Sequence, residues 1–320
     1  MKNDPCKIPL RSISLLVWSF FVFLLSVAYT AKINPELQFL NYAWEIKDRA
    51  ENISSKPDNL SKSGGRIIFC GGSSVLVGIN PDEISNIINK PVLNLGMAAG
   101  MGPKVLSVLA LERIKEGDLL IISLEPDLLT LPQRSLMLAS QMSWISGHPS
   151  WMNPQALDQW VVSLSHLRPG AYHAFTLLGK LIAGKPLYRY EKNELTQSGW
   201  QKINYDTSNL GWPVFSYNLT DGAKKILTRI NDVCHQKGAR CIYVPSLHYC
   251  PEDRLEDHEA GMINFLKEVT EIIPVFSLSK INCSVDESLF ADTPWHPLPQ
   301  EATKNSRRMA SMLNESGLLD

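Results

Sequence analysis

The stretch Arg66–Ser74 reads RIIFCGGSS and determines how the rest of the chain is interpreted. Its apolar run, Ile67 to Cys70, has the length of a fully buried strand, and two glycines and two serines follow directly. Glycine permits a tight turn with close backbone approach. The stretch therefore predicts a strand inside a sheet, followed by a turn that presents a serine hydroxyl at the carboxyl end of the strand.

Short apolar segments and helical segments alternate on both sides of a central interruption. Strands that are apolar throughout, and that alternate with helices, are typical of a parallel sheet covered on both faces. We therefore expect an α/β fold, a flavodoxin-like three-layer sandwich with a mostly parallel sheet. After the first strand, the expected strands are 91–95, 118–124, 241–244 and 272–275, and the expected helices are 81–89, 102–115, 221–237, 253–270 and 300–314.

The alternation is lost between residues 128 and 213, where tryptophan is frequent. We interpret this region as an insertion or cap over the sheet. Two roles for its aromatic residues stay open. They stack on sugar rings or line an acyl groove, or they form the core of a small subdomain.

The N-terminus carries an uncharged apolar run, residues 13–31, preceded by Lys2, Lys7 and Arg11. As a helix the run would be about 28 Å long, close to the hydrocarbon thickness of a bilayer. The preceding positive charges predict a cytoplasmic N-terminus and an exported remainder. We expect one uncleaved transmembrane anchor. The alternative is a cleaved signal peptide, because Ser26–Ala28 resembles a cleavage site.

The sequence thus divides into three expected segments, and it predicts where the protein is located. We expect a cytoplasmic tail and transmembrane anchor over 1–31, a juxtamembrane helix and linker over 32–64, and the α/β domain over 65–320. The protein is expected in the cell membrane as a single-pass protein, with its C-terminal domain periplasmic or extracellular. With 31 basic and 32 acidic residues and no basic cluster, no nucleic-acid partner is expected.

The chain has six cysteines, four of them late in the expected exported part, where disulfides persist. We expect at least one disulfide, Cys234–Cys241 as the first choice and Cys250–Cys283 as the alternative. The cysteine and histidine spacings match no zinc pattern, so neither a metal nor a cofactor is expected.

Asp292 and His296 stand four residues apart in the loop before the last expected helix, far downstream of Ser73. A serine is a weak nucleophile until a histidine takes its proton, and that histidine must be oriented by a third group. The alternative interpretation is that Asp292 and His296 are ordinary polar residues of a loop. Together the three residues predict a catalytic unit of Ser73, His296 and Asp292.

Ligands of such folds bind beyond the carboxyl ends of the strands. Polar residues follow several of the expected strands, and Trp295 precedes the histidine of the catalytic unit. The residues that we expect to line a substrate pocket are Asn94, Glu125, His248 and Trp295.

At these positions the chain resembles the SGNH (GDSL-type) hydrolase superfamily, over about 65–125 and 220–314. Gly71–Ser73 stands where the family has Gly-Asp-Ser, Asn94–Gly100 resembles its second block, and Phe290–His296 resembles its last block. The resemblance implies Ser73, rather than Ser74, as nucleophile. It also implies His296 as base, Asp292 as its orienting acid, and an oxyanion hole of N–H groups from Ser73 and from Gly96 or Gly100.

The chain departs from the family in two places. The acid and the histidine are usually spaced by three residues, and here by four. The third block, Gly-x-Asn, is absent, and Ser123–Pro126 occupies its place, with Glu125 in it.

Together with the expected anchor, the blocks resemble exported accessory proteins of cell-surface acylation, such as those of teichoic-acid D-alanylation and of alginate or exopolysaccharide O-acetylation. The resemblance implies a serine acyltransferase or esterase that acts on O-acyl groups of a cell-surface polysaccharide or polymer, beside a membrane-bound O-acyltransferase. One alternative is a non-catalytic accessory or carbohydrate-binding partner of that enzyme. Another is a general lipase or peptidase of the cell surface.

Overall fold

The computed structural model describes residues 10–33, 49, 65–131, 179, 182–184, 194–203, 210–212, 216–279 and 281–319. The chain forms two compact units, one of residues 1–43 and 154–189, the other of residues 44–153 and 190–320. Residues 34–48 and 50–64 of the expected juxtamembrane helix and linker, and most of the expected insertion at 128–213, lie outside the described residues.

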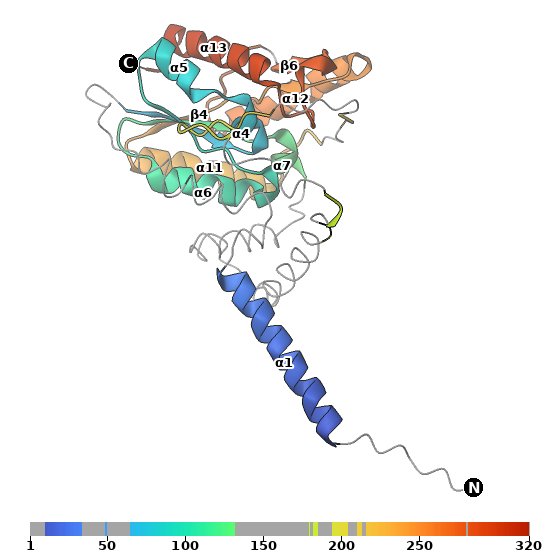
Figure 1. The fold of residues 1–320 in the computed structure, drawn as a ribbon. Coiled ribbons are helices and arrows are strands. Elements are labelled where there is room, and N and C mark those ends of the chain that lie inside the picture. Colours follow the sequence, from blue (N-terminus) through green and yellow to red (C-terminus); the bar gives the residue numbers. More distant parts are fainter. Residues whose placement is uncertain are drawn as a thin grey trace. The chain divides into compact units, whose positions relative to one another are not determined.

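The first unit contains the helix α1 (Leu10–Ile33), drawn in blue in Figure 1. Its side chains are described from residue 12 to residue 25, and large apolar side chains from Ile13 to Leu25 are exposed. Over the described residues, no helix reaches the combination of length and apolar character that crossing a membrane requires.

The second unit is built on a four-stranded parallel sheet with the order β2-β1-β3-β4. This order is compatible with the flavodoxin-like arrangement. The expected parallel α/β sheet is thereby confirmed. The strands are β1 (Ile67–Gly71), β2 (Val92–Asn94), β3 (Leu119–Ser123) and β4 (Arg240–Tyr243).

The strand predicted over 272–275 is reduced to a single bridge between Val275 and Tyr243. The N–H of Tyr243 donates to the carbonyl of Pro274, and the N–H of Phe276 donates to the carbonyl of Tyr243. Proline has no N–H to extend a ladder, so the pairing stays this short.

Helices cover both faces of the sheet (Figure 1). On one face α5 (Pro81–Ile88) packs against α13 (Pro299–Glu315), and on the other α6 (Gly102–Arg113) packs against α11 (Asp221–Gln236). Alternate side chains of β1 serve the two faces, as a strand's period of two requires. Ile67 and Phe69 join the core cluster that includes residues of α5 and α13, whereas the thiol of Cys70 donates to the carbonyl of Leu106 in α6.

The remaining elements are short, except α12, and several of them surround the carboxyl ends of the strands. They are α4 (Ser73–Gly78), η2 (Ala99–Met101), α7 (Pro126–Thr130), β5 (His248–Tyr249), η5 (Glu252–Arg254), α12 (Leu255–Thr270), β6 (Cys283–Ser284) and η6 (Glu287–Leu289). In a second, two-stranded sheet, β5 pairs in parallel with β6.

Candidate active site

Ser73 is the first residue of α4 and directly follows the turn after β1. It is partly exposed, whereas its neighbour Ser74 is buried. The hydroxyl of Ser74 lies 2.9 Å from that of Ser246, which in turn lies 2.9 Å from that of Ser123. Ser74 thus belongs to a buried hydroxyl network beneath the turn, and Ser73 is the serine at the surface of the turn.

Glu125, two residues after β3, accepts hydrogen bonds from the turn that carries Ser73. One carboxylate oxygen accepts the N–H of Gly72 at 3.1 Å and the other accepts the N–H of Ser74 at 2.9 Å. Glu125 is only 1% exposed. Burial, with a contribution from the charge of Asp127, raises the pKa of Glu125 to about 7. The carboxylate is therefore a buried support of the turn that carries Ser73, and does not line an open substrate pocket as expected.

The same contact explains the glycine before the serine. A Cβ on Gly72 would lie 2.2 Å from a carboxylate oxygen of Glu125, closer than any real contact. A side chain at position 72 would therefore require the Glu125 carboxylate to move. The absence of a side chain at Gly72 thus leaves room for the Glu125 carboxylate against the turn.

Asn94, at the end of β2, is fully buried, and its side chain bonds to backbone groups of α4, of Ile79 directly after it, and of Gly96. Its amide nitrogen donates to the carbonyls of Val75 at 2.7 Å and Ile79 at 2.9 Å, and its oxygen accepts the N–H of Gly96 at 2.8 Å. Asn94 is thus a structural clamp on α4 rather than a pocket residue. The predicted role of Gly96 as an oxyanion donor is also corrected, because its N–H is engaged by Asn94.

The other candidate donor, Gly100, lies exposed in η2. Its role stays a prediction, as does that of the Ser73 N–H.

Two segments that the sequence did not connect with the site hold this region together. Arg49, predicted in the juxtamembrane segment, is completely buried and donates to the carbonyls of Gly96 at 2.6 Å and Gly199 at 3.0 Å. From the predicted insertion, the indole of Trp200 donates to the carbonyl of Val77 at 2.6 Å, at the end of α4. No motif or spacing marks either residue.

The predicted acid–histidine pair is present as a contact. Nδ1 of His296 lies 2.6 Å from a carboxylate oxygen of Asp292, and both side chains are almost completely buried. The four-residue spacing closes as a turn, in which the N–H of Ala291 donates to the carbonyl of His296 at 2.7 Å. Because a carboxylate only accepts, Nδ1 carries the hydrogen, and the buried Nε2 is the nitrogen that can take up a proton.

The loop with His296 packs against the helix that begins at Ser73. A Cβ on Gly78, the last residue of α4, would lie 3.3 Å from Cγ of Pro297. The loop then leads into α13, which contacts α4, and Ser306 of α13 accepts the N–H of Asn80 at 2.8 Å. These contacts bring the acid–histidine loop to α4. A hydrogen bond between Ser73 and His296 stays a prediction.

His248 belongs to a buried chain of hydrogen bonds that the sequence did not reveal. Its Nε2 lies 2.7 Å from Nε2 of His258 in α12, whose Nδ1 lies 2.9 Å from the hydroxyl of Tyr217. The other nitrogen of His248 lies 3.0 Å from the carbonyl of Ser246. This carbonyl can only accept, which fixes the order: Tyr217 donates to His258, His258 donates to His248, and His248 donates to Ser246.

Both histidines in this chain are neutral near pH 7. Burial lowers the pKa of His248 to about 4, and burial together with the charge of His248 lowers the pKa of His258 to about 3. The ring of Trp295 lies with its centroid 4.9 Å from that of His248. Trp295 is 8% exposed and His248 1%. The two residues predicted to line a pocket therefore pack on each other beside the acid–histidine loop.

The five described cysteines are free thiols, which differs from the expected disulfide. Both predicted pairs are nevertheless neighbours. The hydrogen bond with Cys241, together with burial, raises the pKa of Cys234. Burial and the neighbouring Cys283 raise the pKa of Cys250 to about 12.

Within the described residues, no cluster of three or more His, Cys, Asp or Glu side chains is arranged to hold a metal ion.

The chain matches no protein-family model, and it matches no curated protein sequence.

Proposed function

We propose that this chain is a membrane-anchored, extracytoplasmic serine acyltransferase or esterase of the SGNH type, with Ser73 as nucleophile, His296 as general base and Asp292 as the group that orients His296. The observation that carries the proposal is the buried 2.6 Å contact between Asp292 and Nδ1 of His296, in a loop packed against the helix that begins at the partly exposed Ser73.

The chemistry follows from this arrangement. Nε2 of His296 takes the proton of the Ser73 hydroxyl while Oγ attacks the carbonyl carbon of an acyl ester. The tetrahedral intermediate collapses as His296 returns the proton to the departing alcohol, which leaves the acyl group on Ser73. A second hydroxyl, from a glycan or from water, loses its proton to His296 and attacks the acyl-serine; the bond between the acyl carbon and Ser73 Oγ then breaks, and His296 returns the proton to Oγ.

The oxyanion in these steps needs backbone donors. Since Gly96 is bonded to Asn94, we assign this role to the N–H of Ser73 and, as a second donor, to Gly100. Glu125 contributes by fixing the backbone on both sides of Ser73 through the N–H groups of Gly72 and Ser74.

The anchor and the partners belong to the same proposal. The uncharged run at 13–31 and the exposed apolar side chains of α1 support a single membrane-spanning helix. The acceptor is then a cell-surface polysaccharide or polymer, and the acyl donor reaches Ser73 from a membrane-bound O-acyltransferase.

A second candidate is a non-catalytic accessory or carbohydrate-binding protein with the same fold. The absence of the Gly-x-Asn block favours it, because Glu125 at this place faces the turn beneath Ser73 and supplies no donor to an oxyanion.

A fluorophosphonate probe separates the two candidates. The full chain in neutral detergent should be labelled on Ser73, and Ser73→Ala should abolish the label. His296→Ala should slow labelling by about 10²–10⁴-fold, since it removes the base. Asp292→Asn should be milder if His296 keeps part of its orientation.

Ser74→Ala is the matched control, because it removes a neighbouring hydroxyl that is buried. It should retain the label. If the native chain is not labelled at all, or if Ser73→Ala is labelled equally, the nucleophile assignment is wrong and the accessory-protein candidate takes its place.

A further inference from the structure

A series of hydrogen bonds joins Arg49 to the turn that carries Ser73. Nε of Arg49 donates to the carbonyl of Gly96 at 2.6 Å. The other end of that peptide group is the N–H of Met97, which donates to the carbonyl of Gly71 at 3.2 Å. The guanidinium is therefore linked to the turn through a single peptide group.

The series continues through the turn to a buried carboxylate. The carbonyl of Gly71 belongs to the same peptide group as the N–H of Gly72, which donates to Glu125 at 3.1 Å. Two peptide groups thus connect a cation at one end with a carboxylate at the other, and every bond donates in the same direction. Hydrogen bonds aligned in this way polarise and strengthen one another where the dielectric constant is low.

All members of this hydrogen-bond series are shielded from water. Arg49 is 0% exposed and Glu125 1%. The four residues whose peptide groups connect them are also buried: Gly71, Gly72, Gly96 and Met97. An arginine stays charged inside a protein, and a charge removed from water is costly unless polar groups hold it. The carbonyl of Gly96 is such a group, so the guanidinium and this loop are fixed to each other.

The second arm of the guanidinium secures the other end of α4. Nη2 of Arg49 donates to the carbonyl of Gly199 at 3.0 Å. Two residues further along, the N–H of Gln201 donates to the carbonyl of Leu76 in α4 at 3.0 Å. One side chain therefore acts on the backbone both before and after the start of the helix at Ser73.

We propose that Arg49 is a positioning residue for Ser73, which holds the turn through these two peptide groups together with Glu125 at the far end of the series. The proposal rests on Ser73 as the nucleophile. The requirement on geometry is strict, because a displacement of about 1 Å can cost about 10²-fold in rate. Lysine cannot replace Arg49, since a single ammonium group does not reproduce a planar fork that reaches two carbonyls.

The rate of fluorophosphonate labelling at several probe concentrations tests the proposal on the full chain in neutral detergent. This measurement separates the maximal labelling rate from the affinity for the probe. Arg49→Lys should lower the maximal rate by about 10- to 100-fold and change the affinity by less than about threefold. Rates are compared per folded chain, with the folded fraction taken from urea unfolding followed by tryptophan fluorescence.

A double-mutant cycle tests the link between Arg49 and Glu125. If both act through one series of hydrogen bonds, the double variant Arg49→Lys/Glu125→Gln should be at most about twofold slower than the slower single variant. A loss equal to the product of the two single losses would show that the two side chains act separately, and would overturn the proposal.

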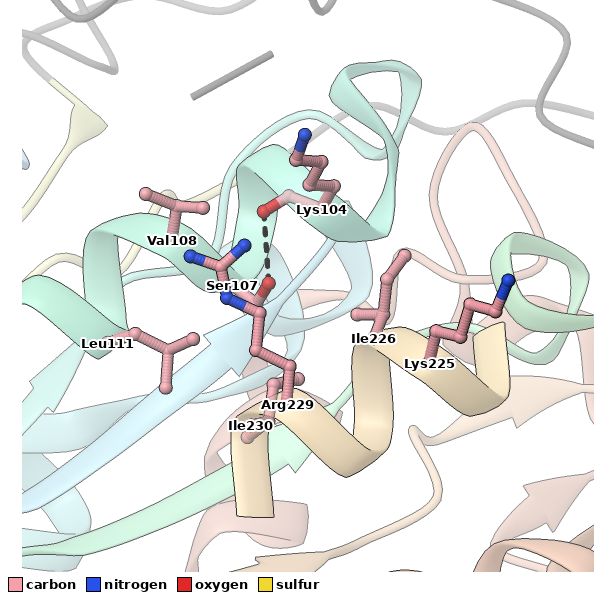
Figure 2. A pocket seen from close by; sticks show the side chains of 8 residues that line it. All are labelled: Lys104, Ser107, Val108, Leu111, Lys225, Ile226, Arg229 and Ile230. Carbon is pink, nitrogen blue, oxygen red and sulfur yellow. Dashed lines mark hydrogen bonds between the residues drawn. The ribbon is translucent and has the colours of Figure 1, made fainter. Parts of the chain in front are cut away.

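Arg66→Lys is the matched control. Arg66 is a buried arginine directly before β1, at the opposite end of the strand from the turn, and its Nη2 lies 2.6 Å from Asp118. Arg229→Lys is a second control, at an exposed arginine on the wall of the pocket between α6 and α11 (Figure 2). Both should keep the maximal rate within about twofold of the native chain. An unchanged rate in Arg49→Lys, or an equal loss in Arg66→Lys, overturns the proposal.

Amide hydrogen exchange distinguishes a failure of this proposal from a failure of the proposed function. A native chain that is not labelled removes Ser73 as nucleophile and leaves the hydrogen-bond series to be tested by itself. The amides of Gly72 and Met97 should then exchange at least about tenfold faster in Arg49→Lys than in the native chain, and at the native rate in Arg66→Lys. Equal exchange in the native chain and Arg49→Lys would show that Arg49 does not hold the turn.

Discussion

Glu125 illustrates how one buried side chain sets local backbone geometry. Its two oxygens each accept one N–H, from Gly72 and Ser74, and leave Ser73 between two fixed neighbours. A Cβ at position 72 would lie 2.2 Å from a carboxylate oxygen of Glu125, so any larger residue there would require the Glu125 side chain to shift. A carboxylate desolvated to this degree is costly in its charged form, which is why burial raises the pKa of Glu125 to about 7.

Replacement of Glu125 by Gln should therefore have a pH-dependent effect on stability. The amide can accept only one of the two N–H groups, which costs about 1–3 kcal/mol. The folded-state pKa of Glu125 is raised, so its stabilising contribution is complete below about pH 4.5 and is lost as the pH rises through about 7. The difference in unfolding free energy between the native chain and Glu125→Gln should therefore narrow by up to about 3 kcal/mol as the pH rises from 4.5 to 7.

Urea unfolding of the native chain and of Glu125→Gln at several pH values, monitored by tryptophan fluorescence, measures this difference in unfolding free energy. Asp82→Asn, in the first turn of α5, is a control that exchanges an exposed carboxylate for an amide. A difference between native chain and Glu125→Gln that stays constant from pH 4.5 to 7 would show that Glu125 does not titrate as described.

At the scale of elements, the histidine chain joins α12 to the loop after β4. Tyr217, His258 and His248 form successive hydrogen bonds that end on the carbonyl of Ser246. The ring of His248 also contacts Trp295, directly before His296. The position of the acid–histidine loop thus depends on neutral histidines packed behind it.

His258→Phe should destabilise the chain by about 1–3 kcal/mol at pH 7, because the polar atoms of His248 and Tyr217 lose their common partner. Burial lowers the folded-state pKa of His258 to about 3, so its contribution is complete above about pH 6.5 and is lost as the pH falls toward 3. The deficit should shrink in acid by up to about 1.4 kcal/mol per pH unit.

The measurement is the unfolding free energy of native chain and variant between pH 7 and pH 4. His235→Phe, on the exposed side of α11, is the control and should show no such convergence. Parallel pH profiles for the native chain and His258→Phe would contradict the neutral hydrogen-bond chain.

At the scale of the whole molecule, the chain divides into two compact units, and α1 belongs to the first. The exposed side chains of α1 from Ile13 to Leu25 are almost all large and apolar, which is unfavourable in water. Insertion into a bilayer, as proposed above, would remove this cost, and Lys2, Lys7 and Arg11 predict a cytoplasmic N-terminus.

Fusion of alkaline phosphatase after Asp320 should give an active enzyme, since this reporter folds only outside the cytoplasm. A fluorescent protein that folds only in the cytoplasm should stay dark at the same position. Mass spectrometry of the membrane fraction should find the N-terminal residues still attached. A mature N-terminus at Tyr29 would instead show a cleaved signal peptide, and a bright cytoplasmic reporter would contradict export.

The sequence by itself predicted most of the sheet and its helices, because hydrophobic periodicity is a local property. β1, β3 and α6 lie where apolar runs and helical spacing placed them. The contact between Asp292 and His296 was likewise predictable, because four residues of chain keep the two side chains close. The reduction of the expected strand 272–275 to a single bridge at Val275 was not predicted. Strand propensity does not account for the missing N–H of Pro274, which limits the ladder.

Only the tertiary structure decided what the polar residues around Ser73 bond to. Glu125, Asn94 and Gly96 were expected at the pocket or the oxyanion hole, and instead they bond to the backbone of the turn, of α4 and of each other. Arg49 and His258 gave no sequence signal, because their partners are far along the chain or are backbone carbonyls. A hydrogen bond within a site depends on distances and directions that exist only after the layers have packed, whereas a strand or a helix is encoded in consecutive residues.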